Sequence, residues 1–253
     1  AGKAILEVYN SNFSHRFKED LSPLTKADTL SNNIICERLK AITPEIPILS
    51  EENSDIPFSI RSLWKKYWLV DPLDGTKEFI KHNDEFTVNI ALIENNRPII
   101  GVIYIPVSNE IYWGSKDSGS FYLNNNISER IQVSKKTQSP IRIITSRSHK
   151  NRVLNYFLEQ PEKYQIIYKG SSLKFCLIAS GEAEIYPRYG PTSEWDTAAG
   201  EAIVRYAGGY VLNQEKKMMA YNSKESFLNP SFIASNNQND IDILLDNLAA
   251  ISD

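Results

Sequence analysis

The sequence predicts a mixed α/β protein whose two parts differ in character. In the first part, short apolar runs follow one another between turns rich in Asn, Ser and Gly, a pattern typical of an antiparallel meander. In the second part, apolar runs alternate with segments whose apolar residues recur at helical spacing, as in an α/β arrangement. The change lies near residues 135–140, so we expect one sub-domain over residues 1–135 and a second over residues 136–253.

The first part is expected to contain a helix followed by a series of strands. Leu30, Ile35 and Leu39 recur at helical spacing after Asp28, which can cap this helix. A short apolar run at residues 46–49 then leads into Ser50-Glu51-Glu52. Further strands are expected at residues 68–70, 86–93, 99–105, 110–113 and 121–123.

The second part is expected to alternate between strands and helices. The predicted strands are residues 141–144, 165–168 and 183–186. The predicted helices are residues 151–159, 171–179 and 196–207. Gly181 and Gly208 follow the last two helices, where glycine commonly ends a helix.

Charge and cysteine content narrow the class of protein. Lys and Arg number 28 against 31 Asp and Glu, a net charge of −3 that argues against a protein that grips nucleic-acid polymers. Cys36 and Cys176 lie far apart in apolar segments, so we expect buried thiols and a reducing cytoplasm. No apolar run is long enough for a membrane-spanning helix, and the sequence contains no P-loop, EF-hand or zinc-binding pattern.

The segment after residues 68–70 carries the strongest chemical signal. Asp71 and Asp74 follow a buried strand, and the Leu73 carbonyl between them completes an all-oxygen set suited to Mg²⁺. Gly75 lets the backbone approach a ligand, and Thr76 adds a hydroxyl. The alternative is an Asp-Gly turn that joins two strands. Two acids at the end of a buried strand favour the metal site, because a cation would offset their desolvation.

Two further acidic positions extend this hypothesis. Glu51 or Glu52 can lie at a strand end, and Asp196 stands at the start of a predicted helix, where it is either a cap or a metal ligand. Together, four carboxylates could hold two or more hard cations and promote an in-line phosphoryl displacement. In the segment 20–28, the local sequence favours a turn and a helix cap at Asp28, and the alternative is a mobile loop that positions water.

The order and spacing of these motifs resemble those of the inositol monophosphatase family. Two segments, residues 71–76 and 195–200, are similar to the family's two signatures, and residues 50–52 are similar to its third metal-binding element. The resemblance implies a five-layer αβαβα sandwich of the inositol monophosphatase and sugar phosphatase type. It also implies a lithium-sensitive phosphatase that uses two to three Mg²⁺ ions per site.

Within that family, nearly the whole chain resembles the bacterial 3′(2′),5′-bisphosphate nucleotidases of the CysQ type. The strings that carry this likeness are residues 20–28, 67–91, 145–149, 170–176, 186–192 and 225–230. The likeness implies that a short N-terminal segment precedes Ala1. It also allows peripheral association with the cytoplasmic face of the inner membrane, although no basic amphipathic helix supports that association.

The resemblance implies a role for each matching residue. It assigns the Mg²⁺ ions to Glu51, Asp71, the Leu73 carbonyl, Asp74 and Asp196. It assigns the attacking water to Asp28, Thr76 and Glu51. Gly75 and Thr76 would bind the scissile phosphate through backbone N–H groups. The substrate as a whole would contact Glu51, Asp74, Gly75, Thr76, Ser171, Lys174, Arg188, Asp196 and His149.

The resulting hypothesis is hydrolysis of the 3′-phosphate of adenosine 3′,5′-bisphosphate to AMP and phosphate, with the sulfated nucleotide as a further possible substrate in sulfur assimilation. Arg and Lys suit a phosphate that is held, whereas metals suit the phosphate that is cleaved. The alternatives are an inositol monophosphatase, a fructose-1,6-bisphosphatase and a non-catalytic nucleotide-binding regulator. A small nucleotide is the expected partner, and the oligomeric state is left open.

Overall fold

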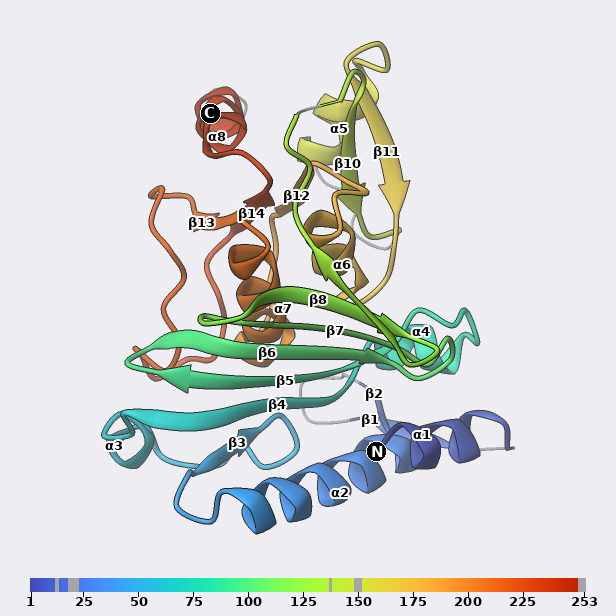
Figure 1. Ribbon diagram of the computed structural model, residues 1–253, viewed down its shortest axis with the longest axis vertical. Coiled ribbons are helices and arrows are strands. Elements are labelled where there is room, and N and C mark those ends of the chain that lie inside the picture. Colours follow the sequence, from blue (N-terminus) through green and yellow to red (C-terminus); the bar gives the residue numbers. More distant parts are fainter. Residues whose placement is uncertain (12–13, 18–22, 137, 148–151, 250–253) are drawn as a thin grey trace.

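The computed structural model describes residues 1–253 except 12–13, 18–22, 137, 148–151 and 250–253 (Figure 1). Its largest sheet has seven strands in the order β3-β4-β5-β6-β7-β8-β9. They are β3 (Ile48–Ser50), β4 (Lys66–Asp74), β5 (Thr87–Glu94), β6 (Arg97–Ile105), β7 (Glu110–Ser115), β8 (Gly119–Asn124) and β9 (Ile127–Ile131). Only the β3–β4 pair of this sheet is parallel, so the expected antiparallel meander is confirmed.

The second sheet has five strands in the order β11-β10-β12-β14-β13. They are β10 (Ile141–Thr145), β11 (Tyr164–Tyr168), β12 (Ile185–Arg188), β13 (Tyr210–Asn213) and β14 (Phe232–Ser235). Strand β10 runs parallel to β11 and β12, whereas β14 is antiparallel to both its neighbours. A short pair, β1 (His15–Phe17) and β2 (Pro23–Thr25), stands apart from both sheets.

Helices fill three layers around the two sheets (Figure 1). The lower layer is α1 (Gly2–Tyr9) and α2 (Lys26–Ile42), the middle layer is α6 (Leu173–Ala179) and α7 (Glu194–Tyr206), and the outer layer is α5 (Arg152–Leu158) and α8 (Gln238–Ala249). The two short helices are α3 (Phe58–Arg61) and α4 (Thr76–Ile80). The layers therefore follow the order α, β, α, β, α that the resemblance implies.

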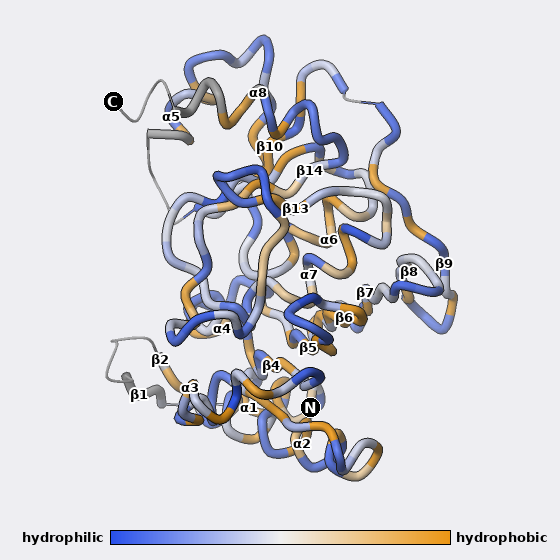
Figure 2. Tube along the Cα trace, turned by 90° about the vertical axis from the view of Figure 1, so that its left-hand side faces the viewer, coloured by the Kyte–Doolittle hydropathy of each residue, from blue (hydrophilic) through white to orange (hydrophobic). Residues whose placement is uncertain are grey.

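Helix α7 lies between the two sheets because its inward residues are small. A Cβ atom on Gly101 of β6 would lie 2.3 Å from the carbonyl oxygen of Ala199, and one on Gly200 would lie 2.3 Å from the ring of Phe175. This close packing holds α7 against β6 on one side and against α6 on the other. Hydrophobic residues accordingly follow the strands and the inner helices, while the peripheral turns are hydrophilic (Figure 2).

Two helix starts differ from the prediction. Helix α2 is capped by Thr25, not by Asp28, and α7 is capped by Ser193, not by Asp196. In each case the aspartate is the third helical residue and accepts a hydrogen bond from the backbone N–H of the cap residue. Both starts are therefore capping boxes, in which cap and third residue satisfy one another.

Several smaller expectations can also be compared with the structure. Cys176 is buried as expected, but Cys36 is only half-buried, and both are free thiols. Among the described residues, none of the helices is both long and apolar enough to span a bilayer. The chain passes from one sheet to the other between β9 and β10, yet α7 packs on both sheets. The division at residue 135 remains a prediction.

Candidate metal and phosphate site

A bulge in β4 brings Asp71 and Asp74 to the same side of the sheet. Residues three apart on a regular strand face opposite sides. Here Asp71 pairs with Asn89 and Asp74 pairs with Thr87, so β4 has one residue more than β5 over this stretch. The Leu73 N–H donates to Asp71 Oδ1 at 3.1 Å and holds that carboxylate in place.

Asp196 joins these two aspartates from the first turn of α7. One oxygen atom from each of Asp71, Asp74 and Asp196 lies within 4.8 Å of the other two. Ser193 N–H donates to Asp196 Oδ2 at 2.8 Å, so the side-chain direction is set by the capping box. The three predicted metal-ligating aspartates therefore meet in one place.

Burial and neighbouring carboxylates disfavour ionisation of two aspartates in this cluster. Burial, followed by the charges of Glu51, Asp74 and Asp196, raises the pKa of Asp71 well above its usual range. Burial and the charge of Asp74 likewise raise the pKa of Asp196 to about 8. Hard divalent cations prefer oxygen ligands, and three clustered carboxylates supply only oxygen atoms. These aspartates therefore fit a metal site.

Glu51 lies beside the cluster but is not one of the three. Its N–H donates to the Val70 carbonyl at 3.1 Å, which continues the parallel β3–β4 pairing next to Asp71. It is half-buried, and its charge raises the pKa of both Asp71 and Asp196. The Leu73 carbonyl accepts a hydrogen bond from Thr76 Oγ1 at 3.3 Å.

Asp28 and Thr76 form a pair next to the cluster. Thr76 Oγ1 lies 3.3 Å from Asp28 Oδ1, while Thr25 donates its N–H and its hydroxyl to Asp28 Oδ2 at 2.7 and 2.6 Å. Asp28 is buried, which raises its pKa. Asp28 is thus not the cap itself: its Oδ2 accepts the hydrogen bonds of the capping box, and its Oδ1 faces Thr76.

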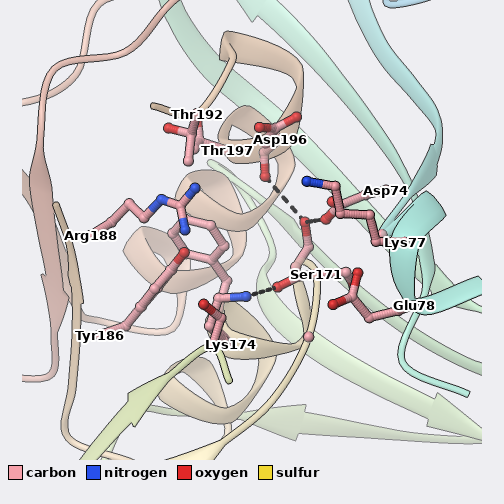
Figure 3. A pocket seen from close by; sticks show the side chains of 15 residues that line it. Asp74, Lys77, Glu78, Ser171, Lys174, Tyr186, Arg188, Thr192, Asp196 and Thr197 are labelled. Carbon is pink, nitrogen blue, oxygen red and sulfur yellow. Dashed lines mark hydrogen bonds between the residues drawn. The ribbon is translucent and has the colours of Figure 1, made fainter. Parts of the chain in front are cut away.

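A cavity of about 210 Å³ opens beside the aspartates. Asp74 and Asp196 lie along one side, and Arg188 and Tyr186 lie along the other (Figure 3). Lys174 is buried in its wall, with Nζ 2.5 Å from the Ser171 carbonyl oxygen.

The backbone and the arginine of this cavity have two unusual features. Gly75 and Ser171 both have positive φ, at +88° and +43°, which tightens the turns on which they lie. The Nε–H of Arg188 is buried and has no hydrogen-bond partner among the described residues. The predicted position His149 lies outside the described residues.

Sequence reasoning did not single out Ser172 and Asn89. Ser172 Oγ lies 2.6 Å from Asp74 Oδ2, and Asn89 Nδ2 lies 2.7 Å from Ser172 Oγ. The available signal was weak: Asn89 is a polar residue in an otherwise apolar stretch of β5. Glu78 also lines the cavity without having been predicted.

Comparison with known proteins identifies the family. A model of the inositol monophosphatase family matches residues 1–250. The chain belongs to the inositol monophosphatase family. It is 46% identical to a protein of Salmonella typhimurium called 3′(2′),5′-bisphosphate nucleotidase CysQ, over 92% of this chain and 94% of that protein. A protein of the same name from Buchnera aphidicola is 48% identical, over 93% of this chain and 89% of that protein.

Solved structures of the family agree with this fold. The crystal structure of CysQ from Bacteroides thetaiotaomicron superposes with a TM-score of 0.78 at 39% identity, covering 93% of each chain. The inositol monophosphatase of Thermotoga maritima superposes with a TM-score of 0.79 at 23% identity, covering 98% of this chain and 93% of that one, which supports the fold alone. The family resemblance noted in the sequence is therefore confirmed.

Proposed function

We propose that the protein is a metal-dependent phosphatase that removes the 3′-phosphate of adenosine 3′,5′-bisphosphate and releases AMP and phosphate. The observation that carries the proposal is the cavity that joins an acidic cluster, including Asp74 and Asp196, to a basic wall, including Lys174 and Arg188. A substrate with two phosphates suits such a cavity, because one phosphate can be cleaved while the other is held. The names of the CysQ relatives support the same class of substrate.

The acidic side of the cavity is proposed to hold Mg²⁺. The ligands would be the carboxylates of Glu51, Asp71, Asp74 and Asp196 and the carbonyl of Leu73. Bound Mg²⁺ would neutralise phosphate oxygens and stabilise the leaving 3′-oxygen. Because Asp71 is buried and Asp196 half-buried beside other carboxylates, they fit a role that requires a cation to offset them.

The residues beside the metal site are proposed to orient water. If Thr76 donates its proton to Asp28, its oxygen keeps lone pairs that can accept a hydrogen bond from the attacking water. Asp28 fixes the direction of that hydroxyl, and Glu51 is proposed to take up the proton of the water. The N–H groups of Gly75 and Thr76 would bind the phosphate that is cleaved.

The opposite wall is proposed to hold the second phosphate and the sugar. Lys174 and Arg188 supply positive charge, and the unpartnered Nε–H of Arg188 can donate to a phosphate oxygen. Ser171 supplies a hydroxyl, and His149 is proposed to lie near the base. We place the protein in the cytoplasm, where the free thiols of Cys36 and Cys176 would stay reduced.

Phosphate release across a panel of substrates tests this proposal. Adenosine 3′,5′-bisphosphate, inositol 1-phosphate and fructose 1,6-bisphosphate are compared with and without Mg²⁺. We expect Mg²⁺-dependent release to be fastest with the nucleotide and to be abolished by Asp71→Asn in a protein that remains folded by circular dichroism. Faster release from either sugar phosphate would overturn the substrate assignment, and near-normal activity of Asp71→Asn would overturn the metal assignment.

A further inference from the structure

Ser172 lies at the centre of a buried polar network that connects the two halves of the site. It is 2% exposed and immediately precedes α6. Its Oγ lies 2.6 Å from Asp74 Oδ2, 3.1 Å from the Asp196 carbonyl oxygen and 2.7 Å from Asn89 Nδ2. One hydroxyl thus contacts both of the elements that carry the clustered aspartates, β4 and α7.

Counting protons fixes the direction of these hydrogen bonds. The Nδ2 amide of Asn89 can only donate, so Ser172 Oγ accepts from it. The single Ser172 proton then has two possible acceptors. A carboxylate at 2.6 Å is a shorter and stronger acceptor than a carbonyl at 3.1 Å. Ser172 therefore donates to Asp74.

The remote end of the network sets the orientation of the Asn89 amide. Its Oδ1 lies 3.1 Å from Thr87 Oγ1, which donates to it. Thr87 Oγ1 also lies 3.1 Å from Ser171 Oγ and, having used its own proton, accepts from that hydroxyl. The donors therefore run in one direction, from Ser171 through Thr87, Asn89 and Ser172 to Asp74. Asn89 Nδ2 also donates directly to Asp74 Oδ2, at the longer distance of 3.4 Å.

A purely local role does not explain the Ser172 hydroxyl. A serine before a helix commonly accepts a hydrogen bond from the first turn. Ser172 is the N-cap residue of α6, yet its side chain makes no such bond. Its hydroxyl is directed across 98 residues of sequence to Asp74 instead.

We propose that Ser172, oriented by Asn89, is a positioning residue that holds Asp74 in the orientation needed to bind the metal ion. This inference rests on the proposed function, in which Asp74 and Asp196 are metal ligands. Donation to Oδ2 leaves Oδ1 of Asp74 available to the ion. Removing a group that hydrogen-bonds a metal-binding carboxylate typically lowers metal affinity or activity by about 10- to 100-fold.

The test measures Mn²⁺ binding to the full chain by electron paramagnetic resonance, without substrate. We expect Ser172→Ala to weaken Mn²⁺ binding by about 10- to 100-fold and to lower kcat, while the KM for the nucleotide changes less than about twofold. Ser172→Thr keeps the hydroxyl and should restore most of the affinity. Ser180→Ala, which removes a hydroxyl at the other end of α6, is the matched control and should bind Mn²⁺ normally.

Two further variants keep the outcome decisive. Asn89→Leu removes the amide at nearly constant size and should also weaken Mn²⁺ binding, which tests the network if Ser172→Ala does not fold. Normal Mn²⁺ binding by folded Ser172→Ala or Asn89→Leu, together with loss of binding in Asp74→Asn, would overturn this inference alone. Normal binding by Asp74→Asn would instead overturn the metal site of the proposed function.

Discussion

Lys174 should give nucleotide binding a pronounced pH dependence. Its side chain is 5% exposed, and burial lowers its pKa from 10.5 to about 8, although Asp74 and Glu78 oppose this shift. Only the protonated amine attracts a phosphate, so affinity should fall as the pH rises through about 8. A group with that pKa is about 90% protonated at pH 7 and about 10% protonated at pH 9, which corresponds to a roughly tenfold loss of affinity.

The inhibition constant of AMP between pH 7 and pH 9 measures this effect. AMP carries the phosphate that Lys174 is proposed to hold, and because the second pKa of a phosphate monoester is about 6, its charge is nearly constant over this range. Saturating Mg²⁺ is required, since the pKa of Asp196 is raised to about 8 without a metal and would titrate in the same window. Bound cations would move the Lys174 transition to somewhat lower pH.

Two substitutions distinguish the loss of charge on Lys174 from other effects of high pH on AMP binding. Lys174→Arg stays protonated throughout and should bind AMP with little pH dependence over this range. Lys174→Met should bind weakly at pH 7 and show no further loss at pH 9. A change of less than about twofold in the wild type, or the full wild-type slope in Lys174→Met, would refute the reasoning.

Three other substitutions give separate tests. Thr76→Val removes the hydroxyl at constant shape and should lower kcat by about 10²- to 10⁴-fold with the AMP inhibition constant unchanged; a wild-type rate of phosphate release would exclude Thr76 from the reaction. Burial raises the pKa of Glu201 from 4.5 to about 7, so the unfolded chain loses this proton first and stability should fall as the pH rises from about 4.5 to 7. Glu201→Gln keeps an acceptor for the Tyr221 hydroxyl. Urea unfolding at pH 5 and pH 8 should show that this variant loses up to about 3 kcal/mol of the decline in the free energy of unfolding. An unchanged decline would contradict the assignment of this pH dependence to Glu201. Gly200→Ala would crowd the ring of Phe175 and should lower the free energy of unfolding by about 1–3 kcal/mol, whereas an unchanged urea midpoint would show that α6 and α7 can separate without cost.

The meander was predictable because its turns have a local chemical signature. Asn95, Asn96, Asn125 and Asn126 all adopt positive φ, which asparagine tolerates better than most residues, at the turns between β5 and β6 and between β8 and β9. The strand after the second turn, β9, was missed because four of its five residues are exposed, so its sequence has no apolar alternation. Hydrophobic patterning detects a strand only where at least one face of that strand is buried.

The helix starts were misplaced although their signature was present. Thr25 and Asp28, like Ser193 and Asp196, are three residues apart, which is the spacing of a capping box. Taking each aspartate as the cap itself places the cap three residues too late in the sequence. The correction also matters for the site, because the box leaves the second oxygen of Asp28 to face Thr76.

The candidate site was predictable in composition but not in geometry. The sequence suggested that Asp71 and Asp74 act together, yet only the bulge in β4 places both carboxylates on one side. The contact of Ser172 with Asp74 joins residues that are 98 positions apart, and no local pattern reports such a contact. The roles proposed for these residues remain predictions until the variants are measured.

Identifying the product of adenosine 3′,5′-bisphosphate hydrolysis tests the central claim most directly. The acidic cluster is proposed to act on the 3′-phosphate while Lys174 and Arg188 hold the 5′-phosphate. Chromatography of a reaction with Mg²⁺ should therefore show AMP and one equivalent of inorganic phosphate, with no product when Mg²⁺ is chelated. Formation of adenosine 3′-monophosphate, or equal phosphate release after chelation, would contradict the account.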